Sequence, residues 1–244
     1  MPVSTDDLDI ATTSITNSLD AVSKAIQQHA NALRQNSADL RRALRILCTV
    51  ADTQGCKIVI TGVGKSFHIG KKLAATLTSI GTRAVSLHAT EALHGDLGII
   101  GHGDCVLALS YSGETDEVVT LASVIHSMRT HTENPMHVWL IGMGKSHASE
   151  LGAWCDAWIA CPVDAELSHV GAPTVSSSLM LAIGDAVAVM LMERQQFGPQ
   201  DFARYHPGGA LGGLSRKAGD VQPVCPVQQT CSPSMLELNS DDTR

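Results

Sequence analysis

The sequence predicts an α/β protein, a three-layer α-β-α sandwich built on a five-stranded parallel sheet of the flavodoxin-like type. Three observations support this fold class. Apolar runs of strand length alternate with longer segments that have helical periodicity. The most regular run, Cys105–Leu109, is apolar at every position, as in a parallel strand buried on both faces. Glycine and hydroxyl residues follow these runs, and open α/β sheets bind ligands at the carboxyl ends of their strands.

Composition excludes several classes of protein. With 44% hydrophobic residues, the 244-residue chain can bury one large core. Its net charge of −7 argues against a nucleic-acid partner, which would require clustered Lys and Arg. The longest apolar stretches have the length of a strand or a core helix, and the acidic N-terminus lacks the features of a secretory signal, so we expect no membrane partner. Seven cysteines without CxxC spacing favour reduced thiols and a cytoplasmic location.

Two helices are expected before the sheet. Residues 1–13 are polar and predicted to be loose, whereas apolar residues recur at spacings of three and four from Ser14 to Gln35. A second helix is expected to follow Ser37 as its N-cap, and both helices would pack across the sheet or across a partner subunit. The resulting division is an N-terminal helical segment (1–36), an α/β domain (37–215) and a disordered tail (216–244).

The first strand, 57–61, leads into a glycine turn and a helix that extends to about Ile80. A Walker A loop would require glycine at Val59, and a dinucleotide GxGxxG motif would require glycine at Phe67. Neither ATP nor NAD is therefore supported. Lys65 and Ser66 remain as anion-binding candidates at a helix N-terminus, with an ordinary solvated lysine as the alternative.

A second strand at 84–88 is followed by a connection that is unusually rich in titratable residues. His88 lies at the end of the strand, and His94 follows within the stretch 89–98. Two histidines and two acids are more than a plain connection needs. For each histidine, a functional role and a structural role are equally good interpretations.

The third strand, Cys105–Leu109, leads into the most informative turn of the chain. The hydroxyls of Ser110, Ser112 and Thr115, with the amides of the next helix, would bind an anion such as phosphate. Glu114 lies within this turn although a carboxylate repels phosphate. Either it carries out chemistry beside the phosphate, or it is an acid favoured by the helix dipole.

The rest of the chain completes the sheet. Residues 142–146 repeat the Gly-x-Gly-Lys-Ser pattern, but in the strand order 2-1-3-4-5 the fourth strand lies outside the reversal point, so we interpret them as a plain turn. The helix 174–197 is apolar on nearly all sides, which indicates burial on several faces and an oligomer. The remaining predicted elements are a helix at 115–129, strands at 137–141 and 157–161, and a short helix at 200–205.

Five motifs together resemble the sugar isomerase (SIS) domain, and within it the arabinose 5-phosphate isomerases. The resemblance covers about residues 35–213, and its most specific parts are the His-Gly-Asp-Leu-Gly and His-Pro-Gly-Gly-Ala-Leu-Gly elements. The motifs are Gly62-Val-Gly-Lys-Ser66, Glu91-Ala-Leu-His-Gly-Asp-Leu-Gly98, Ser110-Tyr-Ser-Gly-Glu-Thr115, Ala172-Pro-Thr174 and His206-Pro-Gly-Gly-Ala-Leu-Gly212.

The resemblance implies a homotetrameric aldose–ketose isomerase that needs no metal and no cofactor. Its substrates would be the phosphosugars D-arabinose 5-phosphate and D-ribulose 5-phosphate, interconverted through an enediol. The implied catalytic positions are Lys65, Glu114, His206 and, in a loop that aligns less cleanly, Glu166. The implied substrate-binding positions are Ser66, Gly81, Thr82, His88, His94, Ser110, Ser112 and Thr115.

This set of side chains suits the reaction. One base can take a proton from the carbon beside a carbonyl and return it to the next carbon, and we assign that role to Glu114. Lys65 would stabilise the enediolate oxygen, and His206 or His94 would move protons between the oxygens or open the sugar ring.

Phe67 and Tyr111 depart from the family pattern, in which smaller residues are usual, and both would reshape the pocket. The long bacterial enzymes carry paired CBS domains after the His-Pro-Gly-Gly element, and we expect none within these 244 residues. Three alternatives remain: a non-catalytic SIS module that senses a phosphosugar, an isomerase for another phosphosugar, and a metalloenzyme. The histidine spacings fit no common metal motif, although His88 and His94 could bind adventitious zinc.

Overall fold

Five parallel strands form one sheet in the order β2-β1-β3-β4-β5. The computed structural model describes residues 4–207. This topology confirms the predicted fold class and the predicted strand order, with its reversal point between β1 and β3. The strands are β1 (Ile58–Gly62), β2 (Ala84–His88), β3 (Cys105–Leu109), β4 (Trp139–Gly144) and β5 (Ala157–Ala160).

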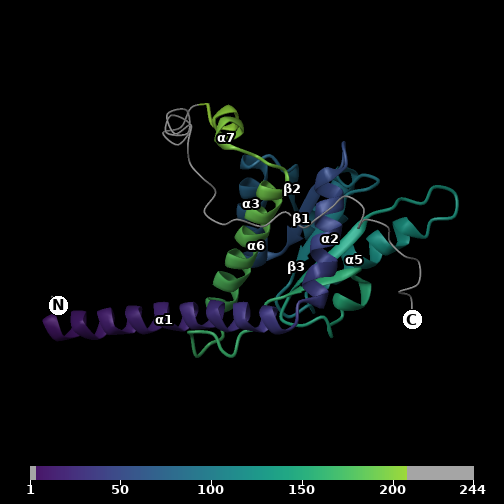
Figure 1. Ribbon diagram of the computed structural model, residues 1–244. Coiled ribbons are helices and arrows are strands. Elements are labelled where there is room, and N and C mark those ends of the chain that lie inside the picture. Colours follow the sequence, from purple (N-terminus) through teal and green to yellow (C-terminus); the bar gives the residue numbers. More distant parts are fainter. Residues whose placement is uncertain (1–3, 208–244) are drawn as a thin grey trace.

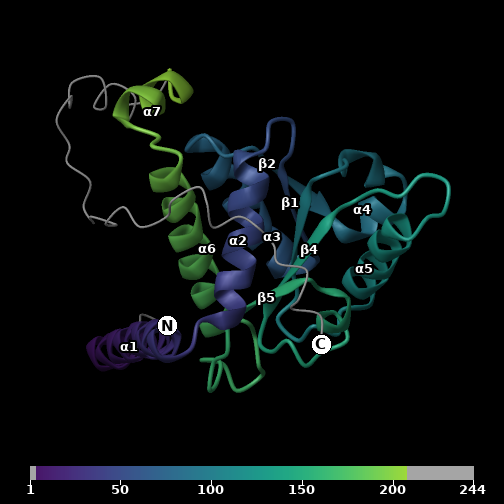
Figure 2. The same ribbon diagram turned by 45° about the vertical axis from the view of Figure 1, so that its right-hand side comes forward.

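Helices cover both faces of the sheet and give it three layers (Figures 1 and 2). Alternate strand residues face opposite sides, so that Ile58 and Ile60 pack with α2, α3 and α6, whereas Val59 packs with α4 and α5. The helices are α1 (Thr5–Gln35), α2 (Ala38–Asp52), α3 (Gly64–Ser79), α4 (Ala89–Leu93), α5 (Asp116–Arg129), α6 (Val175–Arg194) and α7 (Pro199–Tyr205), with 3-10 turns η1 (Asp96–Ile99) and η2 (Gly152–Trp154).

The first helix is longer than predicted. We expected residues 1–13 to be loose, but α1 begins at Thr5. Ser4 and Asp7 form a capping box: the Ser4 hydroxyl accepts a hydrogen bond from the Asp7 amide, and the Asp7 carboxylate accepts one from the Ser4 amide. This local signal outweighs the polar composition of the segment. The start of α1 projects away from the sheet (Figure 1).

Other boundaries differ by a few residues. The fourth strand begins at Trp139 rather than at residue 137, and the connection after β2 is structured, with α4 and η1 inside it. The predicted boundary at 36/37 falls on the break between α1 and α2, but the domain division itself stays a prediction. The predicted tail, 216–244, lies outside the described residues.

Helix α6 has the length and mean hydropathy of a membrane span, which was not expected from the sequence. In the structure it packs against α3 and α1, and its Asp185 pairs with Lys72 of α3. An apolar core helix meets the same criteria of length and composition as a membrane helix. Its contacts make α6 part of the helical layer on the sheet.

A buried carboxylate fixes the amino end of the sheet. The Asp104 side chain is only 2% exposed, and it accepts hydrogen bonds from the Lys57 amide (2.9 Å), the Lys57 ammonium (2.6 Å) and the Gly101 amide (2.7 Å). These three donors join the loop before β1 to the loop before β3.

Replacing Asp104 by Ala should lower the free energy of unfolding by about 3–5 kcal/mol, because it leaves a partly buried ammonium and two amides without their acceptor. Chemical denaturation monitored by circular dichroism measures this loss. Asp185→Asn is the matched control, since its pair with Lys72 is nearly half exposed and should contribute less than about 1 kcal/mol. Equal losses for the two variants would contradict the prediction.

Candidate active site

The strand register brings three turns to one level at the carboxyl edge of the sheet. Gly62, the last residue of β1, pairs with His88 of β2 on one side and with Leu109 of β3 on the other. Lys65 therefore follows β1 three residues beyond that level, and Ser110 follows β3 directly. The turns after β1 and β3 flank the reversal point of the sheet, and the turn after β2 lies next to the turn after β1.

Gly62 allows the turns after β1 and β3 to approach each other. A side-chain carbon at this position would lie 2.9 Å from the Leu109 carbonyl oxygen and 3.2 Å from the Phe67 amide nitrogen, so only glycine fits. Helix α3 begins two residues later with no side-chain cap, which leaves amide groups of its first turn available. Lys65 is exposed there and Ser66 is half-buried, beside the serine loop (110–115).

The serine loop is held by its own hydroxyl groups. The Ser110 hydroxyl is hydrogen-bonded to that of Thr115 (2.9 Å) and accepts from the Gly113 amide (3.1 Å). The Ser112 hydroxyl accepts from the Glu114 amide (3.2 Å). Ser110 is buried and Ser112 is exposed. Ser110 therefore shapes the loop from inside, whereas the Ser112 hydroxyl proton faces solvent and can be donated to an anion.

His88 is held as a hydrogen-bond donor. Its Nδ1 accepts a hydrogen bond from the Thr90 amide (3.3 Å), and the Phe67 ring packs edge-on against it at a centroid distance of 4.7 Å. A neutral imidazole whose Nδ1 accepts carries its hydrogen on Nε2. Histidines that bind metals usually donate from the second nitrogen instead, so this geometry argues against the adventitious zinc suggested for His88. His94, at the end of α4, is exposed.

Glu166 lies in the loop between β5 and α6, where the sequence predicted it, and its side chain caps the start of α6. Its Oε2 accepts hydrogen bonds from the amides of Thr174, Val175 and Ser176 and from the Thr174 hydroxyl, at 2.8–3.3 Å. Partial burial raises the pKa of this carboxyl group, but the hydrogen bonds outweigh burial and hold the pKa below its ordinary value of 4.5. Tyr111 also extends toward this loop, where its side chain hydrogen-bonds the backbone of Val163.

Replacing Glu166 by Gln should cost about 1 kcal/mol of stability at neutral pH, because it removes the charge that caps α6. A carboxyl group whose pKa is lowered by folding stabilises the protein above its unfolded pKa, and this contribution disappears as the pH falls through the folded pKa. The difference between the wild type and Glu166→Gln should therefore shrink below about pH 4.5. Thermal unfolding measured from pH 7 to pH 3 tests this, with Asp164→Asn as the control in the same loop.

Three predicted site residues lie at the opposite edge of the sheet. Gly81 and Thr82 precede β2, and the Thr82 hydroxyl donates to the Gln195 side chain at the end of α6 (2.9 Å). His206 follows α7, which extends from the same end of α6, with its ring stacked on Phe202. Figures 1 and 2 show α7 at the opposite end of the molecule from the start of α6. One chain therefore does not bring these residues together with Lys65 and Glu114.

A family model for the SIS domain matches residues 53–190, more than half of the chain. The chain belongs to the SIS domain family. The matched segment contains β1 to β5 and the glycine and serine turns described above. This membership confirms the resemblance that the five motifs predicted.

SIS relatives include named isomerases. Arabinose 5-phosphate isomerase KpsF of Escherichia coli is 36% identical over 222 residues, which cover 89% of this chain and 63% of KpsF. Arabinose 5-phosphate isomerase KdsD of Yersinia pestis is 44% identical over 157 residues, which cover 64% of this chain and 45% of KdsD. The chain thus spans less than two thirds of the length of these relatives.

Two solved structures resemble the fold of this chain. A protein of E. coli CFT073, solved in complex with arabinose 5-phosphate, has a TM-score of 0.70 and 36% identity, covering 85% of this chain and all of that one. The Vibrio vulnificus NanR protein complexed with ManNAc-6P has a TM-score of 0.62 and 18% identity, covering 86% of this chain and 71% of that one. At 18% identity the likeness shows the fold alone.

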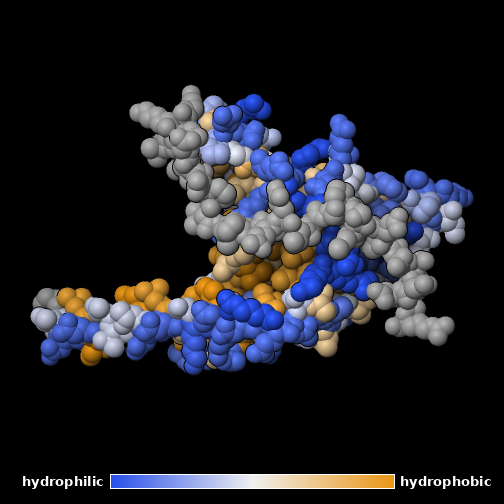
Figure 3. Space-filling model, viewed as in Figure 1, coloured by the Kyte–Doolittle hydropathy of each residue, from blue (hydrophilic) through white to orange (hydrophobic). Residues whose placement is uncertain are grey.

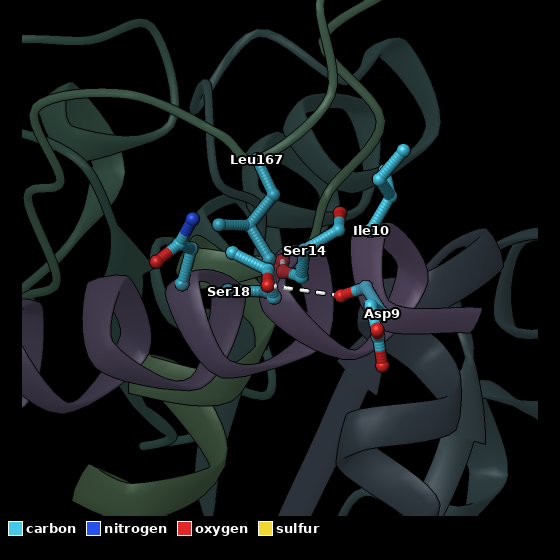
Figure 4. Close-up of a pocket in the computed structure, with 7 residues that line it drawn as sticks. Asp9, Ile10, Ser14, Ser18 and Leu167 are labelled. Atoms are coloured by element: carbon cyan, nitrogen blue, oxygen red, sulfur yellow. Dashed lines mark hydrogen bonds between the residues drawn. The ribbon is translucent and has the colours of Figure 1, made fainter. Parts of the chain in front are cut away.

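A separate hollow of about 630 Å³, shown in Figure 4, is lined by none of the predicted site residues of this SIS domain. It is open to solvent, and its walls come from the first half of α1 and from Leu167 in the loop after β5. Asp9, Ser14 and Ser18 are among its polar residues, and no cation from the described part of the chain lines it. The hollow therefore does not offer the positive groups that a phosphosugar requires.

Sequence reasoning missed the turn after β4, which we interpreted as plain. The turn 145–151 lies against the serine loop, because β4 is the neighbour of β3. The amide of Glu150 donates to Oε1 of Glu114 at 3.1 Å. The repeated Gly-x-Gly-Lys-Ser pattern was the available signal, and the predicted strand order already placed it beside the third strand.

Proposed function

We propose that this chain is an aldose–ketose isomerase that interconverts D-arabinose 5-phosphate and D-ribulose 5-phosphate without a metal or a cofactor. The proposal rests above all on the meeting of the glycine turn and the serine loop at the reversal point of the sheet. Anion donors from both turns lie there beside a lysine and a glutamate. Identities of 36% and 44% to proteins named arabinose 5-phosphate isomerase support the choice of substrate.

The proposed roles follow from the chemistry of the reaction. The exposed Ser112 hydroxyl and the first amides of α3 would hold the phosphate, with Ser66 and Thr115 beside them. Glu114 would move the proton between C2 and C1, and Lys65 would stabilise the enediolate oxygen. His88, held with its hydrogen on Nε2, would donate to a sugar oxygen. Binding the phosphate away from the reacting carbons positions a short and flexible sugar.

The active enzyme is proposed to be a cytoplasmic homotetramer. The projecting half of α1 carries Leu8, Ile10, Ile15 and Leu19 with 56–70% of each side chain exposed, and a soluble monomer rarely leaves such a row uncovered. Figure 3 shows apolar surface along α1 and more of it in the recess between α1 and the rest of the molecule. A partner subunit would also supply His206, Gly81 and Thr82, because within one chain these residues lie at the edge of the sheet opposite Lys65 and Glu114. Light scattering measures the assembly, and a monomer at micromolar concentration would contradict this part of the proposal.

The activity is tested by incubating the purified protein with arabinose 5-phosphate and following the ketose product by NMR. Isomerisation that persists after treatment with a chelator is the expected result. A panel of aldose and ketose phosphates should then be assayed, because Phe67 packs on His88 and Tyr111 reaches the loop after β5, and both would shape the proposed substrate pocket. Saturable binding of a phosphosugar without any turnover would instead support the sensor alternative.

A further inference from the structure

The turn 145–151 is joined to the serine loop by backbone hydrogen bonds along its length. The Lys145 amide donates to the Tyr111 carbonyl at 2.8 Å, and the Leu151 amide donates to the Gly113 carbonyl at 2.9 Å. Between these two bonds the turn also approaches the loop through side chains. A side-chain carbon on Gly113 would lie 2.3 Å from the Ser149 hydroxyl, and Gly113 has φ +74°, so the position requires glycine for two reasons. The turn and the loop therefore form one rigid unit.

This unit sets the direction of the Glu114 carboxylate. Glu114 is exposed, and within the described residues it forms no ion pair. Its Oε1 nevertheless accepts a hydrogen bond from the Glu150 amide at 3.1 Å. The neighbouring Leu151 amide is bound to Gly113, one residue before Glu114, which fixes the Glu150 amide relative to the loop. A hydrogen bond to a charged acceptor is stronger than one between neutral groups.

We propose that the backbone amide of Glu150 is the positioning group for the base Glu114. It holds Oε1 and leaves Oε2 free to carry the proton. Starting from the aldose, Oε2 takes the proton from C2 while the carbonyl oxygen on C1 gains a proton from the histidine that moves protons between the oxygens, His206 of a neighbouring subunit or His94, which gives the enediol. Oε2 then returns its proton to C1 as the hydroxyl on C2 gives its proton to that same histidine, which gives the ketose with the carboxylate and the histidine both regenerated. This inference rests on the proposed function.

A fixed carboxylate has a clear advantage in this reaction. C1 and C2 of the sugar are adjacent, and Oε2 of Glu114 must reach both carbons without rotation of the whole side chain. An exposed glutamate that is free to rotate would spend much of its time in unproductive rotamers. The Glu150 side chain itself is exposed and carries a negative charge, so it contributes nothing to holding Glu114. The contribution comes from the amide alone.

Two substitutions at one position separate the amide from the side chain. Glu150→Ala keeps the N–H group and Glu150→Pro removes it, while both delete the carboxylate. The kcat of the proline variant should be about 10–100-fold below that of the alanine variant, with KM for arabinose 5-phosphate differing by less than about threefold. Equal kcat values in two folded variants would overturn the inference, and so would a loss confined to KM.

NMR tests the contact without relying on activity, and it also covers the case in which the proline variant does not fold. In deuterated, nitrogen-labelled protein, the Glu150 amide resonance should differ clearly between the wild type and Glu114→Gln at neutral pH, because the amide then donates to a neutral oxygen in place of a carboxylate. An amide whose shift is the same in the wild type and in Glu114→Gln at neutral pH would overturn the inference. If the contact is present but Glu114→Gln retains full turnover, the proposed function of Glu114 fails instead.

Discussion

Replacing Glu114 by Gln is expected to lower kcat for arabinose 5-phosphate by about 10²–10⁴-fold, the usual contribution of a general base. Gln has the same shape and can still accept the hydrogen bond from the Glu150 amide, but it cannot take a proton from carbon. The serine loop and the first turn of α3 are unchanged, so the affinity for substrate should stay within about threefold. Isothermal titration with arabinose 5-phosphate measures binding, and NMR measures turnover.

Glu117→Gln provides the matched control for this experiment. It makes the same chemical change in the first turn of α5, three residues away, at a side chain to which we assign no role. Its kcat should remain within about threefold of the wild type. A Glu114→Gln protein that is as active as Glu117→Gln would rule out Glu114 as the base, whereas a loss of binding in Glu114→Gln alone would point to a substrate-holding role.

Replacing His206 by Ala is expected to lower kcat by a similar factor, although His206 lies at the opposite edge of the sheet from Glu114 in the same chain. The loss arises because His206 would serve the site of a neighbouring subunit. The His206 ring stacks on Phe202, and its Nδ1 is hydrogen-bonded to the Phe202 carbonyl oxygen. Because the substitution removes both contacts, circular dichroism must establish that α7 stays folded. The same steady-state assay measures the effect.

Complementation distinguishes a shared site from an indirect effect. When Glu114→Gln and His206→Ala chains are co-expressed with different affinity tags and purified together, some sites contain Glu114 from one chain and His206 from the other. Random assembly should restore up to about a quarter of wild-type activity in the hybrids. Hybrids with no more activity than either parent would show that both residues serve the site of their own chain, or that His206 has no catalytic role.

The sequence by itself determined the sheet and the turns on it. The unbroken apolar run of β3 and the glycines that follow β1 and β3 are local signals, because a parallel strand buried on both faces requires apolar residues at every position. Strand order then followed from the general topology of such sheets, and it placed Lys65 and the serine loop side by side from the sequence alone. The predicted start of α1 was wrong because the local signal for it, the capping box of Ser4 and Asp7, was not taken into account.

Only the tertiary structure decided which side chains meet. The Glu166 carboxylate caps α6, and its place at the site stays a prediction. The turn 145–151 was expected to be plain, but the Glu150 amide within it donates to Glu114. His206 lies at the opposite edge of the sheet. Each outcome depends on where a polar atom finds its partner among residues distant in sequence. Periodicity reports which face of an element is buried, and it carries no information about the direction of a single carboxylate or amide. That direction is set by the packing of whole elements, and here by the register that lays β4 against β3.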